Sequence, residues 1–248
     1  MIIIKSDQEI DTMRRSGEVT GYILRELKDF IKPGMSTKFI DKHVSEIIRE
    51  NGMEPTFKGY NGYPASVCTS VNEEVVHGIP SSKHILREGD IVSVDVGCTY
   101  NGYVSDAART YAVGTVSPEA QKIMDAAEES FFEGLKFCRK GFRLSDISHA
   151  IQKKAENEGF SVIRDLVGHG VGRQMHEEPQ IPNYGKPGRG PRIAKGMVFA
   201  IEPMIAQGTY EVVTAADDWT MSTADGKLAA HYENTVVITD GEPELLTL

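Results

Sequence analysis

The chain has 248 residues, of which 40% are hydrophobic and 25% are charged, as in globular proteins with one large domain or two fused halves. The 27 basic and 36 acidic side chains give a formal net charge of −9, which argues against a general nucleic-acid or anionic-membrane binder. No apolar stretch is long enough to span a membrane, and the three cysteines include no CxxC pair, a pattern that suits a reducing cytoplasm.

Two helices are predicted near the N-terminus. Ser6 and Glu9 form a capping box ahead of an apolar stripe over residues 10–31, which a Pro-Gly pair stops. A second helix is predicted over about 37–50, because apolar residues recur there at helical spacing and an Asn-Gly pair follows. A loop rich in glycine and tyrosine then leads into a β-type run over 65–71.

The stretch Ile91–Tyr111 predicts a β-hairpin, because valines alternate with polar residues and Asn101-Gly102 favours a two-residue type I′ turn. Such a turn places Gly97 opposite Asp106, so that Asp95 and Asp106 become diagonal neighbours on one face. Diagonal residues lie roughly 7–8 Å apart at the backbone, so both carboxylates can reach one point between them. Two anions aimed at one point in an apolar hairpin repel each other unless a cation lies there.

A similar pattern follows the hairpin. Ser117-Pro118 begins a helix predicted to run to about residue 139, and Ser145 is predicted to cap another helix that ends near residue 158. A strand is predicted over 197–202 and a return strand over 229–238.

Landmarks of the two patterns are separated by one offset. The differences Gly141 − Gly34, Gly159 − Gly52 and Gly196 − Gly89 all equal 107. The same offset carries Asp95 onto Glu202. We therefore expect a duplicated architecture in one compact domain over 1–248, with halves of approximately 1–112 and 113–248 related by a pseudo-two-fold axis.

Each half contributes two acidic candidates: Asp95 and Asp106 from the first, Glu202 and Glu233 from the second. His169 lies between glycines that let the backbone approach a site closely. Four carboxylates would neutralise two divalent cations. An oxygen-rich site with one imidazole suits Mn, Fe or Co, whereas Zn usually takes more nitrogen or sulfur ligands. Each residue alone is more simply a surface carboxylate or a satisfied histidine; the joint arrangement favours a hydrolytic dinuclear site.

Other histidines are weaker candidates. His77 and His176 lie outside any HExxH motif, and beside a metal pair they could hydrogen-bond substrate and a developing oxyanion. His231 lies two residues before Glu233 and should share its strand face. The Gly168–Gly172 run is not a dinucleotide fingerprint, because residue 173 is Arg, and neither a GxSxG elbow nor a P-loop is present.

Eight motifs spread over the chain together resemble the type I methionine aminopeptidases, which are pita-bread metallopeptidases. The motifs are Tyr60–Pro64, Val76–Pro80, Val94–Gly97, Ser105–Thr110, Gly168–Gly172, His176–Pro179, Ile201–Pro203 and Tyr232–Thr235. The resemblance implies an α+β fold in which two pseudo-symmetric αβ halves share a central curved antiparallel sheet with helices on its outer face. The short 202–233 segment and the lack of an N-terminal extension resemble the bacterial form.

The resemblance also implies residue roles. The ligands of two divalent metal ions (Co, Mn, Fe or Zn) would be Asp95, Asp106, His169, Glu202 and Glu233. Glu202 would also shuttle a proton, and His176 and His77 would act on the substrate during catalysis. The methionine side-chain pocket would be lined by Tyr60, Tyr63, Cys68, Met175 and Trp219.

The implied reaction removes the initiator methionine from nascent polypeptides whose second residue is small. A cytoplasmic monomer is expected, with the ribosome as a candidate partner and with no specific nucleic acid or membrane bound.

The chain departs from the family pattern at three positions. Asn234 stands where His is expected, His231 where Gln is usual, and Met175 where Phe is more common. Two other classes stay open. One is a pita-bread peptidase that cleaves X–Pro bonds, although such enzymes usually carry an additional N-terminal domain. The other is a non-catalytic pita-bread binding module, although such modules have lost ligands.

Overall fold

The computed structural model describes residues 1–248. Its helices are α1 (Asp7–Phe30), α2 (Thr37–Glu50), α3 (Pro118–Leu135) and α4 (Leu144–Asn157), with a short 3₁₀ turn at Tyr60–Gly62. Its strands are β1 (Glu54–Pro55), β2 (Val67–Val71), β3 (Glu74–Val76), β4 (Ile91–Tyr100), β5 (Tyr103–Ala112), β6 (Ser161–Val162), β7 (Gly168–Gly170), β8 (Glu177–Ile181), β9 (Val198–Ile201), β10 (Met204–Ala206), β11 (Val212–Thr214), β12 (Met221–Thr223), β13 (Ala229–His231), β14 (Asn234–Val237) and β15 (Glu244–Leu245).

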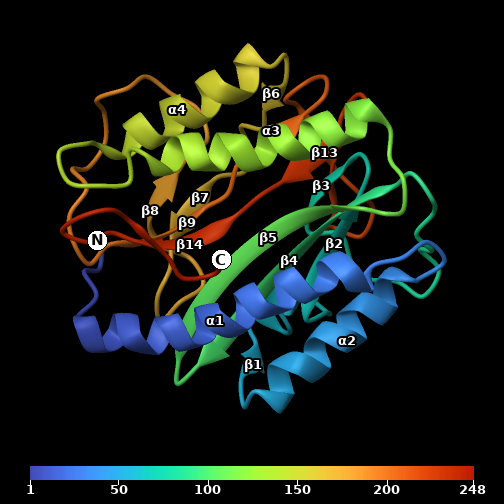
Figure 1. The fold of residues 1–248 in the computed structure, drawn as a ribbon, viewed down its shortest axis with the longest axis horizontal. Helices are drawn as coiled ribbons and strands as arrows, with labels where there is room; N and C mark the ends of the chain where they lie inside the picture. The colour runs from blue at the N-terminus through green and yellow to red at the C-terminus, as the bar shows by residue number, and fades with distance from the viewer.

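The strands lie between two helix pairs. In Figure 1, α1 and α2 lie along one side of the strands, and α3 and α4 lie along the other. All strand pairs are antiparallel. Hydrogen bonding divides the strands into the orders β1-β4-β2 with β5 beside β4, β13-β10-β6, β11-β12-β3, and β15-β14-β9-β7-β8. The helices therefore cover the strands from outside, as the family resemblance implied.

The central hairpin has the register that its turn predicts. Tyr100 pairs with Tyr103 and Gly97 with Asp106, while Asp95 lies opposite Ala108. Asn101 and Gly102 both adopt positive φ, as a type I′ turn requires. Asp95 and Asp106 are therefore diagonal neighbours on one face of the hairpin.

The predicted repeat also appears in the backbone. Helices α2 and α4 begin at residues 37 and 144 and end at residues 50 and 157, so both bounds differ by 107. The paired glycines share a left-handed conformation, with φ of 89° at Gly34 and 99° at Gly141. Glycine reaches such angles without steric cost, so the repeated glycines mark where the chain turns between repeated elements.

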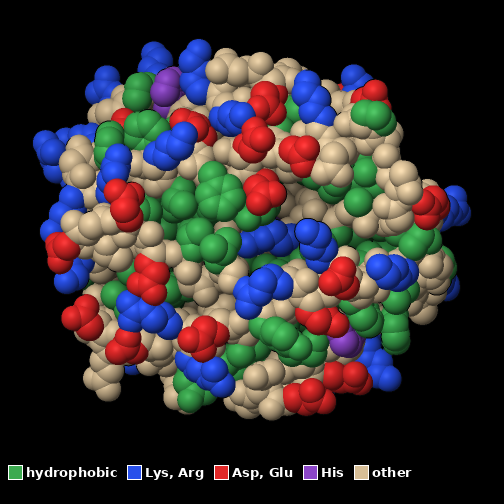
Figure 2. Space-filling view, viewed as in Figure 1, with side chains coloured by type: hydrophobic (Ala, Val, Ile, Leu, Met, Phe, Trp, Pro, Cys, Tyr) green, Lys and Arg blue, Asp and Glu red, His purple; other side chains and the backbone are tan.

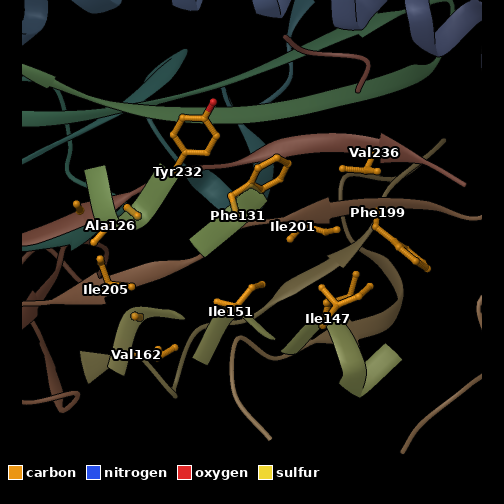
Figure 3. Close-up of a cluster of buried hydrophobic side chains, with 14 of the residues drawn as sticks. Ala126, Phe131, Ile147, Ile151, Val162, Phe199, Ile201, Ile205, Tyr232 and Val236 are labelled. Carbon is orange, nitrogen blue, oxygen red and sulfur yellow. The ribbon is translucent and has the colours of Figure 1, made fainter. Parts of the chain in front are cut away.

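The main core of the second half lies under α3 and α4. Phe131 and Ile151 from these helices meet Phe199 and Ile201 of β9 there, together with Val236 of β14 (Figure 3). Phe131, Ile151 and Val236 are completely buried. Burying each such side chain contributes about 1.5–3 kcal/mol, so this cluster fixes β9 and β14 relative to the helices.

The first half buries an equivalent core, and α1 reaches across to the second half. Ile23, Leu27 and Val44 pack with strand residues of β4. At the other end of α1, Met13 packs with Val198 of β9. Apolar packing therefore joins the two halves along α1.

The C-terminal segment packs against small residues of α1. A Cβ added at Gly17 would lie 2.3 Å from the carbonyl oxygen of Leu246, and one at Gly21 would lie 2.9 Å from that of Leu248. In Figure 1 the C-terminus lies beside α1 and β5. The two glycines therefore permit an approach that no larger residue allows.

Three predicted element boundaries are wrong. The helix predicted to run to about residue 139 ends at Leu135, as α3. The N-cap of α4 is Arg143, not Ser145, whose hydroxyl donates instead to the carbonyl of Arg189 at 3.0 Å. The return strand predicted over 229–238 is two strands, β13 and β14, because their partners β10 and β9 are separated at Glu202-Pro203. Pro203 has no N–H to continue a ladder.

The surface carries acidic and basic side chains side by side, as Figure 2 shows for one face. None of the four helices combines the length and apolar character needed to cross a bilayer. The three cysteines, Cys68, Cys98 and Cys138, are all buried and free.

Candidate functional site

Backbone contacts between the halves bring the four acidic residues together. The Glu233 N–H donates to the Ala108 carbonyl at 2.9 Å, which fixes the β13–β14 connection against β5. The Thr235 hydroxyl donates to the Asp106 carbonyl at 2.8 Å and accepts from the Asp106 N–H at 2.9 Å. Asp95 and Asp106 from the hairpin therefore face Glu233, with Glu202 just beyond β9.

His169 lies on β7 beside β9 and is buried. Its Nδ1–H donates to the Gly170 carbonyl at 2.9 Å. That bond leaves the lone pair on Nε2, which lies 3.7 Å from Asp106 Oδ2 and 3.6 Å from Glu202 Oε1. A histidine held through one nitrogen presents the other as a metal ligand.

Two groups of potential ligands share Glu233. One is Asp95, His231 and Glu233, the other is Asp106, His169 and Glu233, and within each group the ligand atoms lie within 4.8 Å of one another. Within these groups, Asp95 Oδ1, Asp106 Oδ1 and Glu233 Oε1 are buried without a hydrogen-bond partner. Buried carboxylates with free oxygens are costly unless a cation satisfies them. The residues therefore fit divalent metal binding.

Burial dominates the electrostatics of the site. It raises the pKa of Asp106 to about 7, an effect that hydrogen bonding to Asp95 opposes. Burial, followed by the neighbouring carboxylates, also raises the pKa values of Asp95, Glu202 and Glu233 well above the usual range. Burial lowers the pKa of His169 to about 4, so its imidazole is neutral at pH 7.

An apolar cluster adjoins the carboxylates. Cys68 of β2 lies directly opposite Asp95 of β4, so the two side chains share one face of the sheet. Burial, and then the charge of Asp95, raise the pKa of the Cys68 thiol. The cluster contains four of the five residues assigned to the methionine pocket and three others. Its members are Phe57, Tyr63, Ala65, Cys68, Ile79, Met175 and Trp219.

Phe57, Ala65 and Ile79 belong to this cluster but were not predicted from the sequence. Phe57 fills the space left by the missing side chain of Gly97, where an added Cβ would lie 2.5 Å from its ring. A glycine inside a strand can mark a close approach, so Gly97 could have pointed to a contact, but the identity of the approaching residue depends on the fold. Tyr63 is fixed by hydroxyl bonds to the carbonyls of Val67 (3.1 Å) and Gly78 (2.9 Å).

The fifth predicted pocket residue, Tyr60, lies at the rim with His176. The Tyr60 hydroxyl is 2.8 Å from His176 Nδ1, and the His176 ring lies 4.3 Å from that of His169. His77 is half-buried with φ of 62° and lies 6.4 Å from the Trp219 ring, between centroids. Burial lowers the pKa of His77. His176 therefore lies beside the potential ligand His169, and His77 lies beside Trp219 of the apolar cluster.

Two of the residues that depart from the family pattern, Asn234 and His231, lie beside Glu233 but have different surroundings. The amide oxygen of Asn234 accepts from Arg109 Nη2 at 2.7 Å and from the Thr247 hydroxyl at 3.0 Å, so it holds the C-terminal segment. His231 shares the face of Glu233, as predicted, with 3.5 Å between Nε2 and Oε2. The sequence did not predict that His231 joins a group of potential ligands.

Comparisons with known proteins agree with this architecture. The profile of metallopeptidase family M24 matches residues 11–240. A methionine aminopeptidase of Clostridium acetobutylicum is 55% identical over 248 residues, covering 100% of this chain and 99% of the relative. The crystal structure of methionine aminopeptidase from Thermotoga maritima superposes with a TM-score of 0.98 at 47% identity, covering 100% of this chain and 99% of that chain.

A more distant structure shares the fold alone. Prolidase from Pyrococcus furiosus superposes with a TM-score of 0.77 at 23% identity, covering 99% of this chain and 65% of that chain. The α+β pita-bread fold expected from the sequence is confirmed. With a matching family profile over most of its length and a relative more than half identical, the chain belongs to metallopeptidase family M24.

Proposed function

We propose that the chain is a methionine aminopeptidase that removes the N-terminal methionine of newly made polypeptides when the second residue is small. The observation that carries this proposal is the junction of two features: a buried cradle of carboxylates and imidazoles, and an apolar cluster on the same sheet face. The relatives named methionine aminopeptidase support the same reaction.

We assign Asp95, Asp106, His169, Glu202 and Glu233 as the residues that hold two divalent cations of the Co, Mn, Fe or Zn type. When bound, such a pair would polarise the scissile carbonyl and supply hydroxide at neutral pH. The buried carboxylates would hold the cations where the apolar cluster ends. The cations and carboxylates would select a free N-terminus, and the apolar cluster would select an apolar first side chain.

The apolar cluster would bind the methionine side chain. Trp219 and Tyr63 pack edge to face at 5.1 Å, which gives the cluster a rigid aromatic wall. Met175 adds a flexible, polarizable thioether that can adapt to the substrate's own thioether. Cys68 belongs to the same cluster and lies opposite Asp95, so the methionine Cα would come to rest beside the carboxylates.

Glu202, His176 and His77 would move or hold protons. Glu202 Oε1 lies beside His169 Nε2, at the edge of the cradle, where it can take a proton from water and pass it to the leaving amine. With Tyr60 donating to Nδ1, His176 keeps a proton on Nε2 for the developing oxyanion. His77, beside Trp219, would hydrogen-bond the scissile amide.

The same family membership suggests how the chain is organised and where it acts. The halves 1–112 and 113–248 would form one catalytic domain, and the chain would act as a cytoplasmic monomer, since one chain supplies every assigned residue. The substrate would be a nascent polypeptide, with the ribosome as a candidate partner.

The test is methionine release from Met-Ala-Ser by metal-stripped protein resupplied anaerobically with Mn, Fe, Co or Zn. Met-Leu-Ser tests the small second residue, and Ala-Pro-Ser tests the X–Pro alternative. We expect release from Met-Ala-Ser alone, and none from a folded Asp106→Ala variant. Folded, metal-loaded protein with no release would overturn the proposal in favour of a binding module; an active, metal-replete Asp106→Ala variant would overturn the ligand assignment.

A further inference from the structure

His231 has a buried ring nitrogen with no partner among the protein's own atoms. The residue is 1% exposed, and its Nε2 makes no hydrogen bond. Its backbone is fixed, because its N–H donates to Thr110 Oγ1 at 2.9 Å and its carbonyl accepts from the same hydroxyl at 2.9 Å. A buried nitrogen that cannot move to find a hydrogen-bond partner destabilises the fold unless it binds a ligand.

The surroundings of Nε2 are carboxylate oxygens. Glu233 Oε2 lies at 3.5 Å and Glu202 Oε2 at 3.9 Å, and Asp95 completes the group within 4.8 Å. These separations are too long for good N–H···O hydrogen bonds. They do fit donors around one cation, since donors about 2.0–2.2 Å from a metal lie roughly 3–4 Å apart.

His169 and His231 lie in different groups. His169 groups with Asp106 and Glu233, whereas His231 groups with Asp95 and Glu233. We propose that His231 is an additional metal ligand, its Nε2 binding the cation held by Asp95 and Glu233, so that each of the two cations has one imidazole. This inference rests on the dinuclear centre of the proposed function.

A second imidazole would change which metals the site prefers. Imidazole suits Zn and Fe better than Mn, which carboxylates suit. We therefore expect His231 to raise affinity for Zn and Fe relative to Mn at the position that includes Asp95.

The test counts imidazole nitrogens around the bound ions. Metal-stripped wild type is loaded with one and then two equivalents of Mn²⁺, and ¹⁴N couplings are measured by pulsed EPR; isothermal titration gives the two affinities. His231→Gln and His231→Ala are compared with His43→Gln, a control on α2 whose ring stacks on Phe30. We expect two imidazole couplings in wild type and in the control, and one in both His231 variants.

We also expect both His231 variants to bind one ion about 10–100-fold more weakly, with the loss larger for Zn²⁺ than for Mn²⁺. A single imidazole coupling in fully loaded wild type would overturn the proposal without any variant. Unchanged couplings in the variants would overturn it too. A loss of affinity in His231→Ala that His231→Gln restores would show that His231 only positions Glu233. Two imidazoles without Met-Ala-Ser hydrolysis would contradict the proposed function and leave this assignment standing.

Discussion

Replacing Asp106 by Asn should stabilise the protein when metal is absent and weaken its stabilisation by metal. Asp106 is 2% exposed, and its Oδ1 has no hydrogen-bond partner. At high pH the metal-free fold must therefore hold a buried charge that no cation balances. The amide of Asn removes that charge at nearly constant volume.

The size of the effect follows from the pKa of Asp106. Raising it from 3.8 to about 7 on folding corresponds to about 4 kcal/mol, since each tenfold change in proton affinity is worth about 1.4 kcal/mol. The pKa of Asp106 is higher in the folded protein than in the unfolded one. The free energy of unfolding of metal-free wild type is therefore highest below pH 4, and it falls as the pH rises to 7 and Asp106 loses its proton. Metal-free Asp106→Asn should therefore exceed wild type by about 4 kcal/mol at pH 8, and the difference should vanish near pH 4.

Urea denaturation in EDTA at pH 4, 6 and 8 measures the difference directly, and repeating the series with Mn²⁺ gives the metal response. Wild type should gain more stability with Mn²⁺ at pH 8 than the variant does. The reasoning would be refuted if the metal-free variant were no more stable than wild type at pH 8, or if the difference did not change with pH.

Three other changes test the fold and the pocket. Lys5→Met breaks the buried 2.6 Å ion pair with Glu177 and should cost about 3–5 kcal/mol in urea denaturation; a loss below about 1 kcal/mol would contradict an uncompensated carboxylate. Gly17→Ala places a methyl group 2.3 Å from the Leu246 carbonyl oxygen, so the melting temperature should fall by several degrees, and an unchanged value would show that the C-terminal segment moves freely. Trp219→Ala removes part of the aromatic wall and should raise KM for Met-Ala-Ser about tenfold or more. An unchanged KM would remove Trp219 from the pocket.

Local sequence rules predicted much of the first half because short-range chemistry decides it. Asn101-Gly102 fixes the hairpin register, and the register alone places Asp95 diagonal to Asp106. Ser6 forms the predicted capping box, because its partner Glu9 is only three residues away.

The sequence predictions fail where contacts between segments far apart in the chain determine the structure. Ser145 looked like a cap, but residue 189 comes close enough to bind its hydroxyl. Phe57 joins the apolar cluster only because Gly97 leaves room for its ring. His231 could be assigned to the strand face of Glu233 from spacing, but its distance from Glu202 depends on how the halves meet.

Hydrogen bonds join Asp106 to Thr235 and Glu233 to Ala108, so the part of the site that contains the carboxylates should move more slowly than its rim. Asp106 and Glu233 are both buried, and these hydrogen bonds must open before their amide protons can exchange with solvent, so we expect slow exchange. His176 is exposed at the rim, so it can change rotamer without such opening. A polypeptide would thus meet an adjustable entrance in front of reacting groups that hydrogen bonds between the two halves hold in place.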